Sequence, residues 1–180
     1  MNYATIKNCD IANGPGVRVS LFVSGCTHHC KGCFQPETWD FNYGKPFTED
    51  IEKLIFSMLK PDYIAGLTVL GGEPMEYQNM VALFPFIYWV KYKYPKKTIW
   101  LYSGWTYEEL MARNRGYIGW QTKTLLKYVD ILVDGPFVEE KKNIALRFRG
   151  SENQRIIDLR QTEKQGKIVL LDEERKNDVV

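Results

Sequence analysis

The stretch VRVSLFVSGCTHHCKGC, residues 17–33, joins a β-strand pattern directly to a cluster of cysteines. Residues 17–24 are rich in β-branched side chains and roughly alternate along the chain, which predicts a strand. The spacing C-x3-C-x2-C follows at once and places Cys26, Cys30 and Cys33 on a loop. The sequence therefore predicts that three thiols lie together at the carboxyl end of a strand.

Clustered thiols indicate metal ligation or redox chemistry, because a disulfide scaffold would distribute its cysteines along the chain. Three close thiolates favour zinc, copper(I) or an iron–sulfur cluster. A structural zinc site needs a fourth ligand, which His28 or His29 could supply, whereas a [4Fe–4S] cluster held by three cysteines leaves one iron open. Both interpretations stay open at this point. We expect Cys9, which lies outside the spaced triplet, to be a small thiol without a role in the site.

Length and composition predict one globular domain over residues 1–180, since domains contain roughly 100 to 200 residues. Lys+Arg 24 and Asp+Glu 22 nearly balance, which argues against a dedicated nucleic-acid binder. No stretch resembles a membrane span, and the N-terminus lacks the pattern of a signal peptide. We expect a cytoplasmic protein without nucleic-acid or membrane partners, and a mobile C-terminal tail from about residue 160.

Strand and helix patterns alternate after the cysteine cluster. Strands are predicted at 66–70, 98–103 and 130–135, and helices at about 49–59, 78–92, 106–113 and 119–128. Pro85 should kink or restart the second helix. The alternation predicts an α/β fold with a parallel sheet, either open or curled as an incomplete barrel, because a complete eight-fold barrel of about 250 residues does not fit.

Polar and glycine residues come directly after each predicted strand: the cysteine loop, Gly71-Gly72-Glu73-Pro74, Ser103-Gly104 and Asp134-Gly135-Pro136. Parallel α/β folds place their sites at the carboxyl ends of their strands. We therefore expect these segments to converge at one edge of the sheet and to form the site of an enzyme. Taken alone, Gly71-Gly72-Glu73-Pro74 is more typical of an ordinary turn after a strand. Ser103 is equally typical of a helix cap or turn, and Asp134-Gly135-Pro136 has a turn as its alternative.

The cysteine spacing and Gly71-Gly72-Glu73-Pro74 together resemble the radical S-adenosylmethionine (SAM) superfamily. The resemblance implies a partial parallel β/α barrel and one [4Fe–4S] cluster per chain on Cys26, Cys30 and Cys33. It also implies SAM as a cofactor, with its methionine part near Gly71, Gly72, Glu73 and Pro74, where Glu73 offers a carboxylate to the ammonium group. Ser103 is a further candidate contact to SAM.

The position before the third cysteine departs from the wider superfamily. That position is commonly aromatic and lies near adenine, whereas this chain has Gly32, with Phe34 after the cysteine. The resemblance therefore implies an adenine contact from the backbone around Gly32, Cys33 and Phe34, together with the Phe34 ring.

Further segments resemble the activating proteins of glycyl radical enzymes, in particular the family that activates anaerobic ribonucleoside-triphosphate reductase. These segments are 13–18, 24–34 with Trp39, 132–137 and 149–155. The family implies reductive cleavage of SAM and removal of a hydrogen atom from a glycine of the reductase's catalytic subunit, with no side chain needed as acid or base. Because the chain has no second cysteine cluster, an external donor such as reduced flavodoxin would supply the electron.

Two alternatives follow from the same residues. A radical SAM enzyme that acts on a small molecule, such as 7-carboxy-7-deazaguanine synthase, shares the cluster and Gly-Gly-Glu-Pro features. A zinc-stabilised interaction module would not be an enzyme at all. The residues leave the roles of His28, His29 and the 149–155 segment open, as they do the stoichiometry. We expect the aromatic side chains Tyr88, Trp89, Tyr92 and Tyr94 to pack their helix, with partner contact as the alternative.

Overall fold

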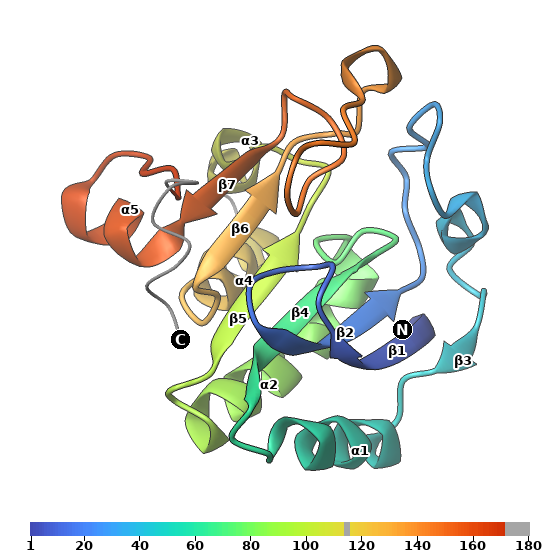
Figure 1. Cartoon of the computed structure of the whole chain (residues 1–180), viewed down its shortest axis with the longest axis vertical. Helices are drawn as coiled ribbons and strands as arrows, with labels where there is room; N and C mark the ends of the chain where they lie inside the picture. The colour runs from blue at the N-terminus through green and yellow to red at the C-terminus, as the bar shows by residue number, and fades with distance from the viewer. Residues whose placement is uncertain (114–115, 172–180) are drawn as a thin grey trace.

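The computed structural model describes residues 1–113 and 116–171, and within these ranges seven strands form one sheet (Figure 1). The strands are β1 (Asn2–Asp10), β2 (Val17–Val23), β3 (Lys45–Pro46), β4 (Ile64–Gly71), β5 (Thr98–Tyr102), β6 (Ile131–Asp134) and β7 (Arg155–Asp158). The helices are α1 (Glu49–Leu59), α2 (Tyr77–Lys93), α3 (Tyr107–Ala112), α4 (Gly116–Leu126) and α5 (Leu159–Gln165), with two short 3-10 turns, η1 (Pro36–Trp39) and η2 (Glu139–Lys141). The fold is therefore mixed α/β.

The sheet has the order β3-β1-β2-β4-β5-β6-β7. Its middle strands β2, β4, β5 and β6 run parallel, as the alternation of strands and helices predicts. The outer strands β1, β3 and β7 are antiparallel to their neighbours, so the sheet is mixed and not purely parallel. None of these three outer strands was predicted from the sequence pattern.

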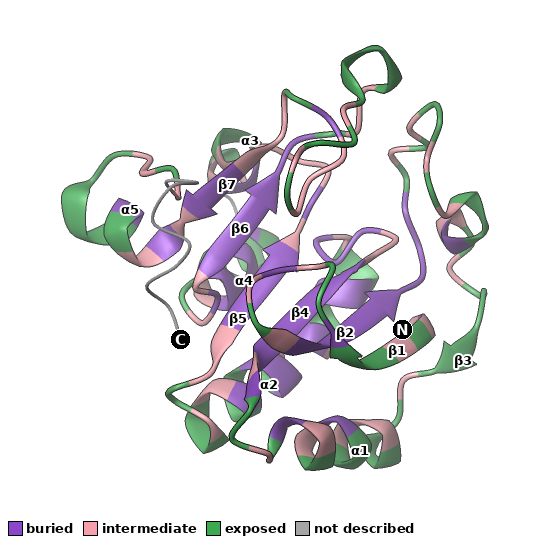
Figure 2. Ribbon diagram, viewed as in Figure 1, coloured by how far each residue is buried: buried purple, intermediate pink, exposed green. Residues whose placement is uncertain are grey.

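The two faces of the sheet have different neighbours because side chains alternate along each strand. On one face, Val19, Leu21 and Val23 of β2 join the core that packs against the helices. On the other face, Arg18 is fully buried and Phe22 lines a cavity. Buried residues dominate the middle strands in Figure 2, whereas α1 has an exposed outer side. The sheet thus separates the helix-packed core from the face that holds the cavity.

Helix α2 continues through Pro85 as one helix of 17 residues. Pro85 is exposed, so the hydrogen bond that it cannot donate would lie on the solvent side of the helix. The opposite side is fixed by buried Met80, Leu83, Phe86, Ile87 and Val90. The expected restart at Pro85 is therefore wrong. Among the helices of the described part of the chain, none has the length and hydropathy needed to cross a membrane.

The beginning of the expected C-terminal tail forms helix α5. The Asp158 carboxylate accepts from the N–H of Gln161 at 2.8 Å, which caps the helix, and Gly166 ends it in a left-handed conformation. Beyond the helix, the Leu171 N–H donates to Ile156 O at 2.8 Å, so the chain returns to β7. Residues 172–180 lie outside the described residues.

Helix α3 begins with a capping box formed by Thr106 and Glu109, where a helix is predicted from residue 106. The Glu109 N–H donates to Thr106 Oγ1 at 3.3 Å, and the Thr106 N–H donates to Glu109 Oε2 at 2.7 Å. We expect Thr106→Ala to lower the free energy of unfolding by about 1 kcal/mol in urea titrations, because one helix N–H loses its acceptor. The matched control is Thr124→Ala, inside α4, whose hydroxyl only donates to Trp120 O. Equal stability of both variants would contradict this role of Thr106.

Candidate functional site

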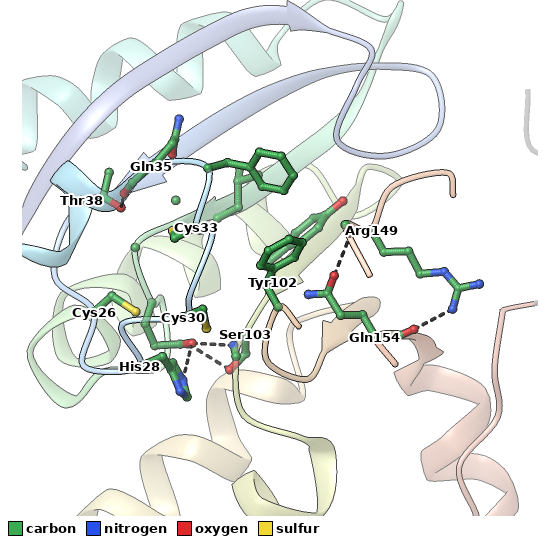
Figure 3. Close-up of a pocket in the computed structure, with 18 of the residues that line it drawn as sticks. Cys26, His28, Cys30, Cys33, Gln35, Thr38, Tyr102, Ser103, Arg149 and Gln154 are labelled. Carbon is green, nitrogen blue, oxygen red and sulfur yellow. Dashed lines mark hydrogen bonds and ion pairs between the residues drawn. The ribbon is translucent and has the colours of Figure 1, made fainter. Parts of the chain in front are cut away.

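A cavity of about 530 Å³ opens at the carboxyl ends of the parallel strands. It is lined by residues of the cysteine loop, by Gly71, Gly72 and Glu73 after β4, by Ser103 and Gly104 after β5, and by Gly135 after β6. Figure 3 shows Cys26, Cys30 and Cys33 of the cysteine loop around the same space as Ser103 and Gln154. The expected convergence at one edge is thus present, and the volume suits a small-molecule cofactor.

The three spaced cysteines all line this cavity. Cys26 is buried, Cys30 and Cys33 are partly buried, and none of them forms a disulfide. Burial raises the pKa of the Cys26 thiol to about 11, and burial also raises the pKa of Cys30. Without a metal these two thiols therefore stay protonated near neutral pH, so a bound metal would have to displace their protons.

Backbone hydrogen bonds join the cysteine loop to the loop after β4. The Gly72 N–H donates to Val23 O and the Glu73 N–H donates to Gly25 O, both at 2.8 Å. A Cβ on Gly72 would lie only 2.7 Å from Gly25 O, so this position requires glycine. Gly25 also requires glycine, because a Cβ there would lie 2.3 Å from the Phe41 ring. The glycines thus allow the two loops to pack together beside the cavity.

The donor set at the cavity fits an iron–sulfur cluster better than a single zinc ion. Among the described residues, no three His, Cys, Asp or Glu side chains converge as they would on one metal ion. His28 lies against Glu73, and the ring of His29 packs on Trp39 with centroids 4.7 Å apart. Neither histidine is therefore placed to complete a tetrahedral zinc site with the cysteines. Three thiols around one cavity suit a cluster that presents a separate iron to each of them.

Glu73 is the most connected polar side chain of the site, although it is only 1% exposed. Its Oε1 accepts from the Met75 N–H at 2.8 Å and from Ser103 Oγ at 2.9 Å, and its Oε2 accepts from the Gly104 N–H at 2.6 Å. A buried carboxylate needs such partners to offset its lost hydration. Any contact that Glu73 makes to a ligand ammonium would come in addition to these bonds.

His28 connects the same carboxylate to the cysteine loop. Its Nε2 lies 3.1 Å from Glu73 Oε2, and its ring lies 4.3 Å from that of Trp105, measured between centroids. Nε2 makes no well-directed hydrogen bond, so the contact with Glu73 is mainly electrostatic. Glu73 raises the pKa of His28. A Cβ on Gly104 would lie 2.6 Å from the imidazole, so glycine there makes room for His28.

Ser103 lines the cavity, but its hydroxyl already forms two hydrogen bonds within the protein. It donates to Glu73 Oε1 at 2.9 Å and accepts from the Trp105 N–H at 3.2 Å. A hydroxyl has one proton and two lone pairs, so Ser103 can only accept from a ligand. It is therefore suited to a ribose hydroxyl and not to a carboxylate.

The remaining candidate residues differ in their placement. Cys33 and Phe34 line the cavity, whereas Gly32 is exposed and Pro74 is buried outside the set of lining residues. The Phe34 ring is 66% exposed and packs against Phe137 with centroids 5.2 Å apart. Phe34 thus stands at the rim of the cavity.

Several lining residues were not predicted as site residues, among them Asn13, Tyr102 and Gln154. Tyr102 could have been found from alternation along β5, because it lies two residues after the buried Trp100. Asn13 and Gln154 lie in segments that carry the family resemblance, but their spacing alone assigns no direction to their side chains.

The 149–155 segment builds one wall of the cavity. Gln154 Oε1 accepts from the Gly150 N–H at 2.8 Å, and Gln154 Nε2 donates to Gly135 O at 3.1 Å. Asn153 Nδ2 donates to Pro136 O at 2.8 Å. These bonds hold the segment against the turn after β6, and Gly135, Gly150 and Gln154 all line the cavity.

Asp134, at the end of β6, binds other residues of the protein and does not line the cavity. Its carboxylate is fully buried, pairs with Arg155 Nη2 at 2.5 Å and accepts from the Tyr107 N–H at 2.6 Å. Arg155 also donates to Glu108, and these hydrogen bonds lower the pKa of Glu108. The group therefore fastens β6 and β7 to the start of α3.

Comparisons with known proteins show which family this chain resembles. Residues 12–157 match the family model described as a 4Fe-4S single cluster domain. An anaerobic ribonucleoside-triphosphate reductase-activating protein of Enterobacteria phage T4 is 40% identical over 158 residues, covering 87% of this chain and 93% of the relative. Proteins with the same name from Pasteurella multocida and Escherichia coli are 42% and 37% identical, covering 86% and 89% of this chain and 95% and 100% of the relatives.

Proposed function

Because this chain belongs to the family of anaerobic ribonucleoside-triphosphate reductase-activating proteins, we propose that it activates such a reductase by radical SAM chemistry. In this proposal it cleaves SAM reductively and generates a glycyl radical on the catalytic subunit of the reductase. The observation that carries the proposal is the meeting of Cys26, Cys30 and Cys33 with Gly71 and Gly72 around one cavity of about 530 Å³.

The three thiols would hold one [4Fe–4S] cluster. When bound, the cluster supplies an open iron for the amino and carboxylate groups of SAM and the electron that breaks a sulfonium C–S bond, giving methionine and a 5′-deoxyadenosyl radical. In this scheme the backbone at Gly71 and Gly72 lies beside the methionine part, while Cys33 and Phe34 lie beside adenine. Ser103 Oγ would accept from a ribose hydroxyl.

The apolar side chains of the cavity would protect a reactive radical from water. Phe22, Leu70, Phe137, Leu146 and Phe148 all line the space. The radical would take a hydrogen atom from a glycine Cα, which releases 5′-deoxyadenosine and leaves the unpaired electron on the glycine. The proton moves together with its electron as one hydrogen atom, directly from carbon to carbon, so the site needs no acid or base. In this proposal the face of the sheet that carries Phe22 and Leu70 forms the inside of a partial barrel.

The partners of the proposed reaction are proteins. A segment of the reductase that contains the reacting glycine would enter the cavity, and an external donor such as reduced flavodoxin would supply the electron. Both steps would take place in the cytoplasm, on a chain that acts as one domain over residues 1–180.

The test is anaerobic reconstitution with iron and sulfide, followed by reduction with dithionite in the presence of SAM. We expect a brown protein that forms 5′-deoxyadenosine, and an EPR signal of a glycyl radical when the reductase is added. A colourless protein that carries one zinc ion and forms no 5′-deoxyadenosine would overturn the proposal. Formation of 5′-deoxyadenosine without any complex or radical on the reductase would instead favour a small-molecule substrate.

A further inference from the structure

A continuous row of aromatic rings crosses the outer helices α2 and α4, on the opposite face of the sheet from the cavity. We define it as the aromatic ridge, consisting of Tyr117, Trp120, Phe84, Tyr128, Tyr88, Trp89 and Tyr92. Successive ring centroids along this order lie 5.3 to 6.4 Å apart. Each ring thus packs against the next, which produces a single surface and not scattered side chains.

Most of the ridge is open to solvent. Tyr92 is 69% exposed, Tyr117 60%, Trp120 55% and Trp89 46%. The expectation that the aromatic side chains of residues 88–94 pack their helix is therefore wrong for Tyr92, while Tyr88 and Trp89 are only partly covered, at 37% and 46% exposed. Tyr94 does pack and donates its hydroxyl to Phe56 O at 2.8 Å. Contiguous exposed apolar surface of this kind marks an interaction site, and Trp and Tyr dominate the binding energy of protein interfaces.

The two helices of the ridge carry charge of one sign, and acidic side chains, Glu49 and Glu52 of α1, lie beside it at its Trp89 end. Helices α2 and α4 contain lysines but not a single Asp or Glu. Lys93, Lys123 and Lys127 are exposed, and none of them forms an ion pair within the described residues. Such a surface complements an acidic protein face. It disfavours a second copy of this chain, because a symmetric contact would bring the same lysines together.

The ridge starts at the edge of the sheet where the cavity opens. Helix α4 begins there with Tyr117 near its first turn, and the row of rings ends at Tyr92 near the opposite end of α2. The start of α2 touches the cysteine loop, since Glu76 Oε1 accepts from the Thr27 N–H at 2.9 Å. A protein that inserts one segment into the cavity must rest the remainder of its surface outside, and the ridge lies within reach of that edge.

We propose that the aromatic ridge docks an acidic face of the reductase whose glycine enters the cavity. This inference rests on the proposed function and adds to it a second contact surface outside the cavity. The ridge contributes apolar area through its rings and long-range attraction through its lysines. Contacts at both surfaces would hold the large partner while its reacting segment stays in the cavity.

The test measures the dissociation constant of the complex with the reductase, using reconstituted full-length protein. We expect Tyr117→Ala/Trp120→Ala and Lys123→Glu/Lys127→Glu each to weaken binding at least tenfold at low salt. The effect of the charge reversal should shrink as the salt concentration rises. The matched controls are Tyr63→Ala and Lys60→Glu, which alter an exposed tyrosine and an exposed lysine away from the ridge. Thermal unfolding followed by circular dichroism shows whether each variant is folded.

Formation of 5′-deoxyadenosine with dithionite and SAM alone separates this inference from the proposed function. We expect both ridge variants to retain wild-type rates in that assay. Unchanged reductase binding by folded ridge variants would overturn the inference, as would ridge variants that lose only self-association or only binding to anionic vesicles. If the wild-type protein binds the reductase through the ridge but never cleaves SAM, the inference stands and the proposed chemistry is wrong.

Discussion

Cys30→Ala is expected to abolish both iron binding and the formation of 5′-deoxyadenosine. Two thiols, Cys26 and Cys33, would remain at the cavity, and a cluster with only two protein ligands would lose its hold on the chain. No other described group is placed to substitute, since His28 lies against Glu73 and His29 packs on Trp39. Iron per chain after anaerobic reconstitution and product formed with dithionite and SAM measure the two losses.

The control for this variant is Cys9→Ser. Cys9 is exposed and lies in strand β1, outside the set of residues that line the cavity. We expect this variant to bind as much iron as the wild-type protein and to form product at the same rate. If Cys30→Ala kept its iron while Cys9→Ser lost it, the assignment of the cluster to the spaced triplet would be wrong.

The parallel part of the fold was predictable because its strands and helices carry strong local patterns. Strands β2, β4, β5 and β6 are short apolar runs that end in glycine or a polar turn, and α1 repeats its apolar residues at helical spacing before Pro61. The outer strands β1, β3 and β7 have no such pattern. Strand β1 mixes buried and exposed residues and is interrupted by register shifts against β2. Its pairing depends on tertiary contacts, which local sequence does not encode.

The location of the site was predictable from topology, because every candidate segment follows a parallel strand. The directions of its side chains were not. The sequence offers Glu73 as a ligand for an ammonium group, yet its carboxylate accepts hydrogen bonds from Met75, Ser103 and Gly104. These partners come from different loops, and only the folded chain shows that they share one acceptor.

The exposure of the aromatic ridge could not be predicted from the sequence either, because it also depends on tertiary packing. Helix α2 is apolar around most of its circumference, so periodicity does not tell its buried side from its exposed side. Leu83 and Phe86 are fully buried, whereas Trp89 is nearly half exposed. The packing of α2 on the core, with α4 beside it, decides which rings face solvent and join into one surface.

Glu73→Gln is expected to destabilise the protein and to weaken the binding of SAM at least tenfold. The carboxylate accepts from two backbone N–H groups and the Ser103 hydroxyl, and it lies 3.1 Å from His28 Nε2. A glutamine amide has one acceptor oxygen, so its NH₂ group would face at least one of these donors. Each buried donor left unpaired costs about 1–3 kcal/mol of stability. Urea unfolding and equilibrium binding of SAM to the reconstituted protein measure the two effects.

The variant His28→Gln removes the imidazole beside Glu73 and leaves the hydrogen bonds that Glu73 accepts in place. Its effect therefore measures the electrostatic contact apart from those bonds. Glutamine keeps a donor near the carboxylate but loses the imidazole that packs on Trp105. We therefore expect a smaller loss of stability than in Glu73→Gln and an intact iron content, because His28 is not a cluster ligand in this assignment.

Since Glu73 holds the loops after β4 and β5 around the cavity, its removal should loosen the backbone at Gly104 and the cysteine loop together. Wild-type stability and SAM affinity in Glu73→Gln would show that the buried carboxylate does not organise the site.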